Sequence, residues 1–395
     1  MESNKKEKII LVSPAYPYRG GQALVESYMY KTINELGYDA LTVSYSLLYP
    51  SIFFPGTTQF DDSKIIPFEH TNKIKRIINS INPFSWYRAA RFIKKEKPDA
   101  VIFVWWMPFF APALSTIARL LKKNNKKIQI TFLVENYISH EKRWFDRFFT
   151  KRTLRRADSF ICQSEFIEKQ IQQDFKQTPI HKTTLSIYDC YNLNRYTKQT
   201  AKDFLNIDTQ NVILFFGLIR PYKGLDKLIE TFAHIAKEKP DTTLLIVGEC
   251  YDDITKYQNI IKKHDLQTKT MLVNKFIANE DVEPYFKAAD VVVLPYYSGT
   301  QSGILMMAYG FEIPVVATDV GGISELIVEN KTGIVVNNNE IEHLSPAINQ
   351  ILDTKDDFPY SEEIRKYTHN LGYVNMANIL KKIIENGHEK TNFNH

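Results

Sequence analysis

Two cationic side chains stand close together in a loop that joins a predicted strand to a predicted helix. Arg220 and Lys223 follow the apolar run Val212–Gly217. The helix has one apolar face, formed by Leu225, Leu228, Ile229 and Phe232. Cations beside the amides of a helix start suit a diphosphate better than a monoanion. The spacing therefore predicts a diphosphate site at Gly217, Arg220 and Lys223, and the alternative is that the two cations are simply solvated.

A second loop of small residues follows a later strand. The run Val291–Pro295 leads into SGTQSG, after which we expect a helix over Ile304–Tyr309. Unpaired amides at a helix start attract phosphate. We expect the same diphosphate to contact the amides of Thr300, Gln301, Ser302, Gly303 and Ile304. The segment by itself is equally compatible with an ordinary connection.

Gly20 and Gly21 occupy a comparable place near the start of the chain, between the run KIILVSP and an amphipathic helix. Glycine lets the backbone approach a phosphate or a sugar closely. The GxGxxG spacing of dinucleotide-binding proteins is absent, which disfavours that kind of site. A flexible turn that needs positive φ is the alternative.

Short apolar runs alternate with segments of helical period, the pattern of βα units in parallel sheets. In the first half we predict strands at Lys8–Ser13, Ala40–Tyr45, Ala100–Trp106, Ile128–Val134, Phe160–Gln163 and Thr183–Ile187. In the second half we predict them at Val212–Gly217, Thr243–Gly248, Met271–Asn274, Val291–Pro295, Val315–Thr318 and Gly333–Val336. The fold class is therefore α/β, with two Rossmann-like doubly wound domains facing across a cleft.

The domain limits follow from a polar stretch between residues 189 and 211. We expect a first domain at 1–195, a second at 196–370, and a C-terminal helix with a frayed tail at 371–395. The helical pattern of the tail starts at Ser361 and continues to Lys382.

Charge is distributed unevenly along the 395 residues. Residues 1–200 contain 31 Lys and Arg against 18 Asp and Glu, a net charge of +13, whereas the rest contains 19 against 27, a net charge of −8. Aromatic residues interleave with the basic clusters of the first half, as in Arg143–Arg156. Such a surface suits anionic lipid or phosphate. Ordinary solvated helix faces are the alternative, and no nucleic-acid motif accompanies the charge.

The cysteines and the apolar segments favour a cytoplasmic protein. Cys162, Cys190 and Cys250 lie far apart, without metal-ligand spacing. The first apolar run is too short for a signal peptide. The most apolar segment, Ala100–Leu121, contains two prolines and Arg119, so we interpret it as a strand, a loop and a helix rather than a membrane span.

Several segments together resemble a known family. They are G-x-x-R-P-x-K-G, FIANEDVEPYFKAADVVVLP, and PVVATDVGGISELI followed by ENKTGIVV. This ordered set resembles the donor-binding half of the group 1 (family four) glycosyltransferases, which have the GT-B fold. The resemblance is strong over residues 211–336 and looser in the first half, where the Gly20-Gly21 loop is similar to the one that opens those enzymes.

The resemblance implies a chemistry. These enzymes transfer a sugar from a nucleotide diphosphate with retention and without a metal, and an arginine and a lysine of the loop contact the diphosphate. Lys223 matches the lysine. The family's arginine directly follows the glycine, where this chain has Leu218, so Arg220 would act from a shifted place. Positive charge there stabilises the leaving group as it gains negative charge.

One departure concerns two glutamates of the family, the second of which holds the ribose. Gly299 and Met307 occupy those positions here. Gln301 and Ser302 would substitute, the donor would bind differently, or the activity is lost. Glu325 matches a family glutamate after Gly321-Gly322, and capping of the next helix is its alternative role.

The sugar end of the site is expected beyond the run IQITFLV. The family places a histidine at the end of this strand, where this chain has Asn136. His140 is our candidate for bonding the sugar or orienting the reacting groups, with Glu135 as a second polar contact. A loop histidine without such a role is the alternative.

We therefore expect a cytoplasmic, metal-independent retaining glycosyltransferase of hexosyltransferase type, acting in cell-surface polysaccharide or glycoconjugate biosynthesis. Its donor substrate would be a UDP- or GDP-linked sugar bound mainly by the second domain, with no further cofactor. The first domain would take a glycan or lipid-linked acceptor, with peripheral contact to anionic lipid at the inner face of the membrane. No nucleic acid is expected as a partner. A sugar-nucleotide epimerase, which needs no acceptor, and a non-catalytic nucleotide-sugar-binding protein are the alternatives.

Overall fold

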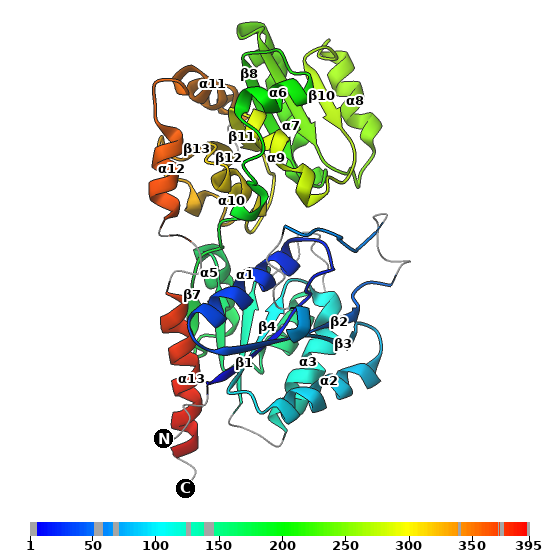
Figure 1. Cartoon of the computed structure of the whole chain (residues 1–395), viewed down its shortest axis with the longest axis vertical. Helices are drawn as coiled ribbons and strands as arrows, with labels where there is room; N and C mark the ends of the chain where they lie inside the picture. The colour runs from blue at the N-terminus through cyan, green and yellow to red at the C-terminus, as the bar shows by residue number, and fades with distance from the viewer. Residues whose placement is uncertain are drawn as a thin grey trace. The chain divides into compact units, whose positions relative to one another are not determined.

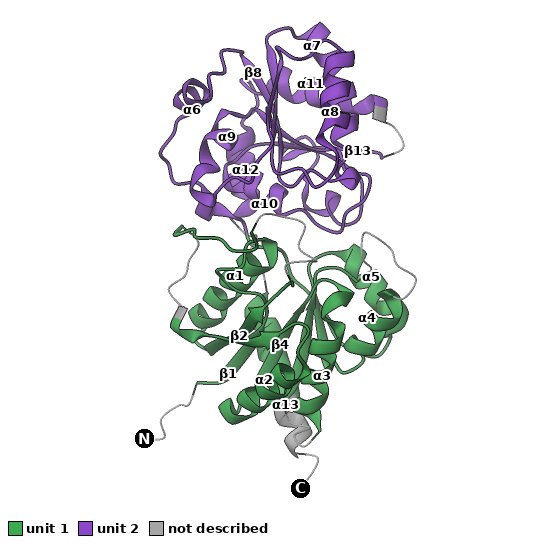
Figure 2. Cartoon of the chain, turned by 90° about the vertical axis from the view of Figure 1, so that its right-hand side faces the viewer, with its two compact units in different colours: residues 1–186, 372–395 green, residues 187–371 purple. Residues whose placement is uncertain are grey.

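The fold is that of a computed structural model, which describes residues 6–50, 58–65, 71–123, 128–137, 146–338, 341–369, 371 and 375–392. Contacts divide the chain into two compact units (Figure 2). The first unit comprises residues 1–186 and 372–395, and the second comprises residues 187–371. The C-terminal helix thus belongs with the first unit.

Seven strands form the sheet of the first unit, in the order β3-β2-β1-β4-β5-β6-β7. Among the described residues every pair of neighbouring strands is parallel; for instance, Ile10 lies between Leu41 of β2 and Val101 of β4. The inner strands are mostly buried on both faces and largely apolar, although β2 also contains the buried polar residues Thr42 and Ser44. The strands are β1 (Lys8–Val12), β2 (Asp39–Leu47), β3 (Ile74–Asn79), β4 (Ala100–Trp105), β5 (Gln129–Val134), β6 (Ser159–Cys162) and β7 (Ile180–Lys182).

Helices cover both faces of this sheet (Figure 1). They are α1 (Gly21–Glu35), α2 (Pro83–Glu96), α3 (Ala111–Lys122), α4 (Asp146–Leu154), α5 (Glu165–Asp174) and α13 (Met376–Asn392). Local sequence sets their starts: the Asn82 side chain accepts a hydrogen bond from the Phe84 amide, with Pro83 in the first turn, and Ser164 caps α5 in the same way.

Six strands form the sheet of the second unit, in the order β10-β9-β8-β11-β12-β13. Its described pairs are also parallel, and β8 lies between β9 and β11. The strands are β8 (Asn211–Phe216), β9 (Thr242–Val247), β10 (Thr270–Val273), β11 (Val291–Leu294), β12 (Val315–Thr318) and β13 (Gly333–Val336). Both sheets therefore have the strand order of a doubly wound Rossmann sheet, and the predicted α/β fold class is confirmed.

The helices of the second unit are amphipathic or buried. They are α6 (Lys198–Leu205), α7 (Leu225–Glu238), α8 (Ile254–Lys263), α9 (Glu283–Ala288), α10 (Gly303–Gly310), α11 (Leu344–Thr354) and α12 (Tyr360–Thr368). Short 3₁₀ helices also occur: η2 (Thr71–Lys73), η3 (Pro108–Phe110), η4 (Asp189–Tyr191), η5 (Pro221–Lys223), η6 (Asn279–Asp281), η7 (Ser324–Leu326) and η8 (Ile341–His343). The face of α7 predicted to be apolar is fully buried at Leu225, Leu228, Ile229 and Phe232.

The sequence predictions fail at the edges of the first sheet. The prediction of a strand at Thr183–Ile187 is wrong, because the edge strand β7 is Ile180–Lys182 and the chain leaves the sheet after it. The opposite edge strand, β3, was not predicted, because exposed Lys75 and Arg76 interrupt its apolar pattern. Edge strands are short and half-exposed, so their sequences carry little of the apolar signal that marks central strands.

The apolar segment Ala100–Leu121 and the C-terminal tail also give clear outcomes. Residues 100–122 form β4, η3 and α3, which confirms the predicted strand, loop and helix. No helix in the described ranges has the length and apolar character needed to cross a membrane. The single helix predicted from Ser361 to Lys382 is wrong: α12 ends at Thr368 and α13 begins at Met376, because their buried residues pack in different units.

Candidate functional site

The carboxyl ends of β8 and β11 lie side by side at the centre of the second sheet. The strand order reverses between these two strands. Loops on either side of such a reversal leave a crevice at the carboxyl edge, where open α/β sheets bind ligands. The loops that follow β8 and β11 are the two segments predicted to bind diphosphate.

Backbone contacts hold the two loops together. The Tyr297 amide donates a hydrogen bond to the Tyr222 carbonyl oxygen at 2.8 Å. Gly224 has φ 65°, and a Cβ at this position would lie 1.9 Å from the carbonyl oxygen of Pro295. Only glycine permits this approach, so the first loop depends on Gly224 to reach the second.

Lys223 is the central charge of the site. Its side chain is buried, and its Nζ lies 5.5 Å from the centre of the Tyr296 ring. A Cβ on Gly217 would lie 3.2 Å from this Nζ, so the ammonium group sits directly beside the end of β8. The small size of Gly217 makes room for it.

The electrostatic state of Lys223 favours an anionic ligand. Burial lowers the pKa of the ammonium group; Tyr222 opposes this effect, and the charge of Arg220 adds to it. Burial raises the pKa of the Tyr296 phenol to about 12, so this neighbour remains neutral. No carboxylate in the described part of the chain forms an ion pair with Lys223. A buried cation without a counter-ion gains most from an anion that enters the site.

Arg220 lies at the edge of the same loop, half-buried. Its guanidinium carbon lies 5.1 Å from the centre of the Tyr251 ring. The chain beside it is fixed by the Tyr251 amide, which donates to the Ile219 carbonyl oxygen at 3.0 Å. Arg220 thus stands between the loops that follow β8 and β9, close enough to lower the pKa of Lys223.

The 300–304 turn is adjacent to Lys223 through Ile304. A Cβ on Gly217 would lie 3.1 Å from the Ile304 Cδ1 atom. Helix α10 starts at Gly303, and the Ser302 side chain does not cap it. The Gln301 Nε2 atom is buried without a hydrogen-bond partner among the described residues. The turn therefore offers an amide side chain and an uncapped helix start beside the buried cation.

Gly321 and Gly322 support this turn from the next strand. The Gly322 amide donates to the Thr300 carbonyl oxygen at 3.0 Å. Gly321 has φ 60°, and a Cβ there would lie 1.8 Å from the Gly299 carbonyl oxygen. Glu325 follows in η7 with an exposed side chain, and it does not act as the side-chain cap of that helix.

The structure gives physical reasons for the residues at the two unusual positions. A Cβ on Gly299 would lie 3.0 Å from the Ile323 Cδ1 atom, so a glutamate there would require Ile323 to move. Met307 is buried in α10. The carboxylates expected from the family resemblance are absent, and the unpaired Gln301 amide lies in the same turn.

The first unit has a second polar site at the carboxyl end of its own sheet. Gly20 has φ 113° and precedes α1, while a Cβ on Gly21 would meet no atom within 4 Å. The Gln22 Nε2 atom donates to Glu135 Oε2 at 3.0 Å. Sequence reasoning missed Gln22, because it gives no chemical signal apart from its position after the two glycines.

Glu135 is a buried carboxyl group with spare bonding capacity. It follows β5 and is 9% exposed, and its Oε1 atom has no hydrogen-bond partner among the described residues. Burial raises its pKa to about 7, and the Gln22 hydrogen bond opposes this shift. Near neutral pH this carboxyl group can both accept and donate a proton.

The remaining residues to consider are the histidine expected at the sugar end of the site and any side chains that could hold a metal ion. His140 lies outside the described residues. Asn136, at the family's histidine position, donates from Nδ2 to the Trp106 carbonyl oxygen at 3.3 Å. Within the described ranges, no group of three or more His, Cys, Asp or Glu side chains is placed to hold a metal ion.

Comparisons with known proteins agree with this fold. Residues 197–371 match the family model of the glycosyl transferases group 1. An uncharacterized glycosyltransferase of Methanocaldococcus jannaschii is 23% identical over 370 residues, which cover 91% of this chain and 90% of the relative. The match of the family model covers nearly all of the second unit.

Two solved structures have a similar fold. Sucrose-phosphate synthase from Thermosynechococcus elongatus superimposes with a TM-score of 0.71 at 16% identity, covering 96% of this chain and 99% of that one. Anabaena HepE in complex with UDP has a TM-score of 0.71 at 15% identity, covering 96% of this chain and 100% of that one. The resemblance noted in the sequence is confirmed: residues 197–371 match the group 1 glycosyl transferases, and the whole chain has the fold of solved GT-B glycosyltransferases.

Proposed function

We propose that the protein transfers a sugar, with retention, from a nucleoside diphosphate to a glycan or lipid-linked acceptor. The observation that carries the proposal is the Lys223 ammonium group, which is buried beside the end of β8 and the start of α10 and has no carboxylate partner among the described residues. The leaving diphosphate gains negative charge during transfer. A cation fixed in a site of low polarity stabilises that charge most in the transition state.

The donor is a nucleotide sugar, and a resident metal is not required for charge balance. Lys223 and Arg220 supply two positive charges, and the Gln301 amide and the α10 amides supply hydrogen bonds. The similar fold of Anabaena HepE, solved in complex with UDP, supports a uridine donor. Because no described contact selects the base, we propose UDP- and GDP-linked hexoses as the donors to test.

The acceptor binds the first unit, at the loop that follows β1. Glu135 accepts a hydrogen bond from an acceptor hydroxyl through its unpartnered Oε1 atom, while Gln22 fixes the other oxygen. Gly21 leaves open space beside this pair for a sugar ring. The product would belong to a cell-surface polysaccharide or glycoconjugate made at the inner face of the membrane.

The decisive experiment is thermal unfolding of wild type and Lys223→Met with UDP, GDP and their sugars. A ligand that binds the native state at 100 times its Kd adds about 2.7 kcal/mol of stability. We expect one diphosphate to stabilise wild type and none to stabilise Lys223→Met. The apo variant should unfold at the same temperature or higher, because methionine removes a buried unpaired charge and keeps the apolar stem.

Lys237→Met is the matched control, because Lys237 is an exposed lysine of α7. It should keep the full response to the diphosphate. Equal stabilisation of wild type and Lys223→Met by every nucleotide would contradict the proposed site.

A non-catalytic nucleotide-sugar-binding protein is the second candidate, favoured by Gly299 and the buried Met307 where the family has carboxylates. It predicts binding without turnover over a broad panel of acceptors. The third candidate, an epimerase, predicts conversion of the nucleotide sugar with no acceptor present. Product analysis with and without acceptor therefore separates all three functions.

A further inference from the structure

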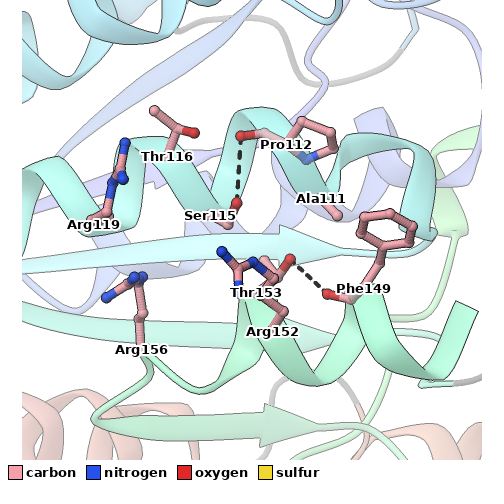
Figure 3. A pocket seen from close by; sticks show the side chains of 9 residues that line it. All are labelled: Ala111, Pro112, Ser115, Thr116, Arg119, Phe149, Arg152, Thr153 and Arg156. Carbon is pink, nitrogen blue, oxygen red and sulfur yellow. Dashed lines mark hydrogen bonds between the residues drawn. The ribbon is translucent and has the colours of Figure 1, made fainter. Parts of the chain in front are cut away.

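A basic pocket lies between α3 and α4 of the first unit (Figure 3). Its volume is about 280 Å³. It is lined by Ala111, Pro112, Ser115, Thr116 and Arg119 from α3, and by Phe149, Arg152, Thr153 and Arg156 from α4 and the residues that follow it. Neither the family match nor the donor site involves these residues.

Three guanidinium groups line this pocket. No carboxylate in the described part of the chain pairs with Arg119, Arg152 or Arg156. Burial lowers the pKa of Arg156, and the charges of Arg155, Arg119 and Arg152 lower it further. The groups therefore repel one another, and an anion in the pocket would relieve that repulsion.

The other cations of α4 show that, in this helix, the cation without a described carboxylate partner is on the side that faces the pocket. Arg147 and Lys151 each contact Asp174 of α5, at 3.0 and 3.1 Å. The acidic residue next along the chain, Asp158, is engaged by Lys122 and accepts from the Ile130 amide at 2.8 Å. Asp174 thus compensates part of the positive charge on one face of α4, whereas no described carboxylate compensates the face toward α3.

The polar groups of the pocket require a ligand that accepts hydrogen bonds. The Thr153 hydroxyl donates to the Phe149 carbonyl oxygen at 2.9 Å, and the Ser115 hydroxyl donates to the Pro112 carbonyl oxygen at 3.4 Å (Figure 3). Their hydrogens are therefore used within the helices. The guanidinium groups remain as the strong donors, and their forked geometry matches the oxygens of a phosphate.

We propose that this pocket binds a phosphate group, carried either by a small phosphorylated compound or by the headgroup of an anionic lipid. The volume exceeds that of a phosphate alone, so part of the attached alcohol enters as well, against the half-exposed ring of Phe149. Three cations balance a dianion with charge to spare. The inference does not depend on the donor site of the second unit.

Substitution of the three arginines tests the proposal on the full chain. One variant combines Arg119→Gln, Arg152→Gln and Arg156→Gln, and a second carries lysine at the same three positions. The matched control removes three exposed cations of α2, through Arg88→Gln, Arg91→Gln and Lys95→Gln. Thermal unfolding without ligand should be unchanged or raised in the glutamine variant, because repulsion is removed.

Two binding measurements distinguish the sources of the phosphate. Calorimetry with inorganic phosphate and glycerol phosphate measures the small-compound arm. Sedimentation with phosphatidylcholine vesicles, with and without phosphatidic acid, measures the lipid arm. For whichever ligand wild type binds, small phosphate compound or phosphatidic acid vesicle, we expect the affinity of the glutamine variant to be lower by at least about tenfold. The lysine variant should lose affinity in part, since it keeps the charge but not the fork.

Each outcome decides the question. Binding in the first arm alone assigns a small phosphorylated ligand, and selective binding of phosphatidic acid vesicles assigns a lipid headgroup. Absence of binding in both arms overturns the proposal. Equal losses in the glutamine variant and the α2 control also overturn it, because the attraction would then be diffuse rather than located in the pocket.

Discussion

Lys223 and Glu135 are buried ionisable groups, each at the carboxyl end of a strand, and burial disfavours the charged form of both. The pKa of the lysine is lowered, and that of the glutamate is raised to about 7. Neither group completes its interactions within its own unit: the lysine has no carboxylate partner in the described residues, and Glu135 Oε1 has no hydrogen bond there. Such groups are candidates for direct contact with substrate.

The Glu135→Gln variant should remove a pH dependence of stability. The folded pKa of about 7 lies above the ordinary value of 4.5, so the folded state holds the proton more tightly than the unfolded chain. Stability is therefore greatest below pH 4.5 for this group and falls as the pH rises toward 7, by roughly 3 kcal/mol. Chemical denaturation of wild type and variant between pH 4.5 and 7.5 measures the difference.

The glutamine keeps the size of the side chain, so its stability should be flat where that of wild type falls. Glu230→Gln, at an exposed position of α7, is the control and should keep the wild-type slope. Identical slopes in wild type and Glu135→Gln would mean that Glu135 is ionised at its ordinary pKa in the folded protein.

The sequence analysis named both Lys223 and Glu135, but it did not predict the bond between Gln22 and Glu135. Lys223 could be predicted because the glycines, the cations and the helix start lie within a few residues of one another. The bond between Gln22 and Glu135 joins residues 113 positions apart. Its importance depends on which oxygen is left unpaired after folding, and no local pattern carries that information.

At the scale of elements, glycines determine how closely the loops approach. Gly224→Ala would place a Cβ 1.9 Å from the Pro295 carbonyl oxygen in a backbone of φ 65°. We expect a loss of at least about 1–3 kcal/mol of stability, together with weaker diphosphate binding, because the loops after β8 and β11 must separate. Denaturant unfolding and nucleotide titration measure the two effects.

Gly21→Ala is the matched control for that substitution. A Cβ at Gly21 meets no atom within 4 Å, so the folded state should keep its stability. The same variant should weaken acceptor binding if a sugar ring occupies the open space. A Gly224→Ala protein as stable as Gly21→Ala would show that the loops can relax without cost.

The central strands of both sheets were predictable, and the edges of the first sheet were not. Strands such as β4 and β5 are buried at every position, which produces a continuous apolar run. The edge strand β7 has three residues, none of them buried. There the five-residue run Thr183–Ile187 has the stronger β pattern, although the hydrogen bonds of the sheet stop before it. Which residues pair with the sheet at its edge therefore depends on the position at which the chain turns away from the sheet.

At the scale of the whole molecule, the positive net charge of the first half can be interpreted only once the ion pairs of its lysines and arginines are known. The sequence shows a net charge of +13 over residues 1–200 without indicating which cations are neutralised. Asp174 takes two cations of α4, and the arginines facing α3 keep their charge. The structure thus identifies, within this basic half, one pocket whose three arginines have no carboxylate partner among the described residues.

The C-terminal helix α13 also contributes to the fold at this scale, because it belongs to the first unit although the chain passes through the second unit before it. Leu380 is fully buried in α13, which packs against β4 and β5. Leu380→Ala should cost about 2–5 kcal/mol, whereas Lys381→Ala, at a side chain that is 68% exposed, should change stability by less than about 0.5 kcal/mol. Hydrogen exchange should then accelerate in β4 and β5 while residues 217–224 and 300–304 keep both their protection and their diphosphate affinity. Equal loss of protection in the second unit would instead mean that the two units unfold as one cooperative body, and that donor binding depends on the end of the chain.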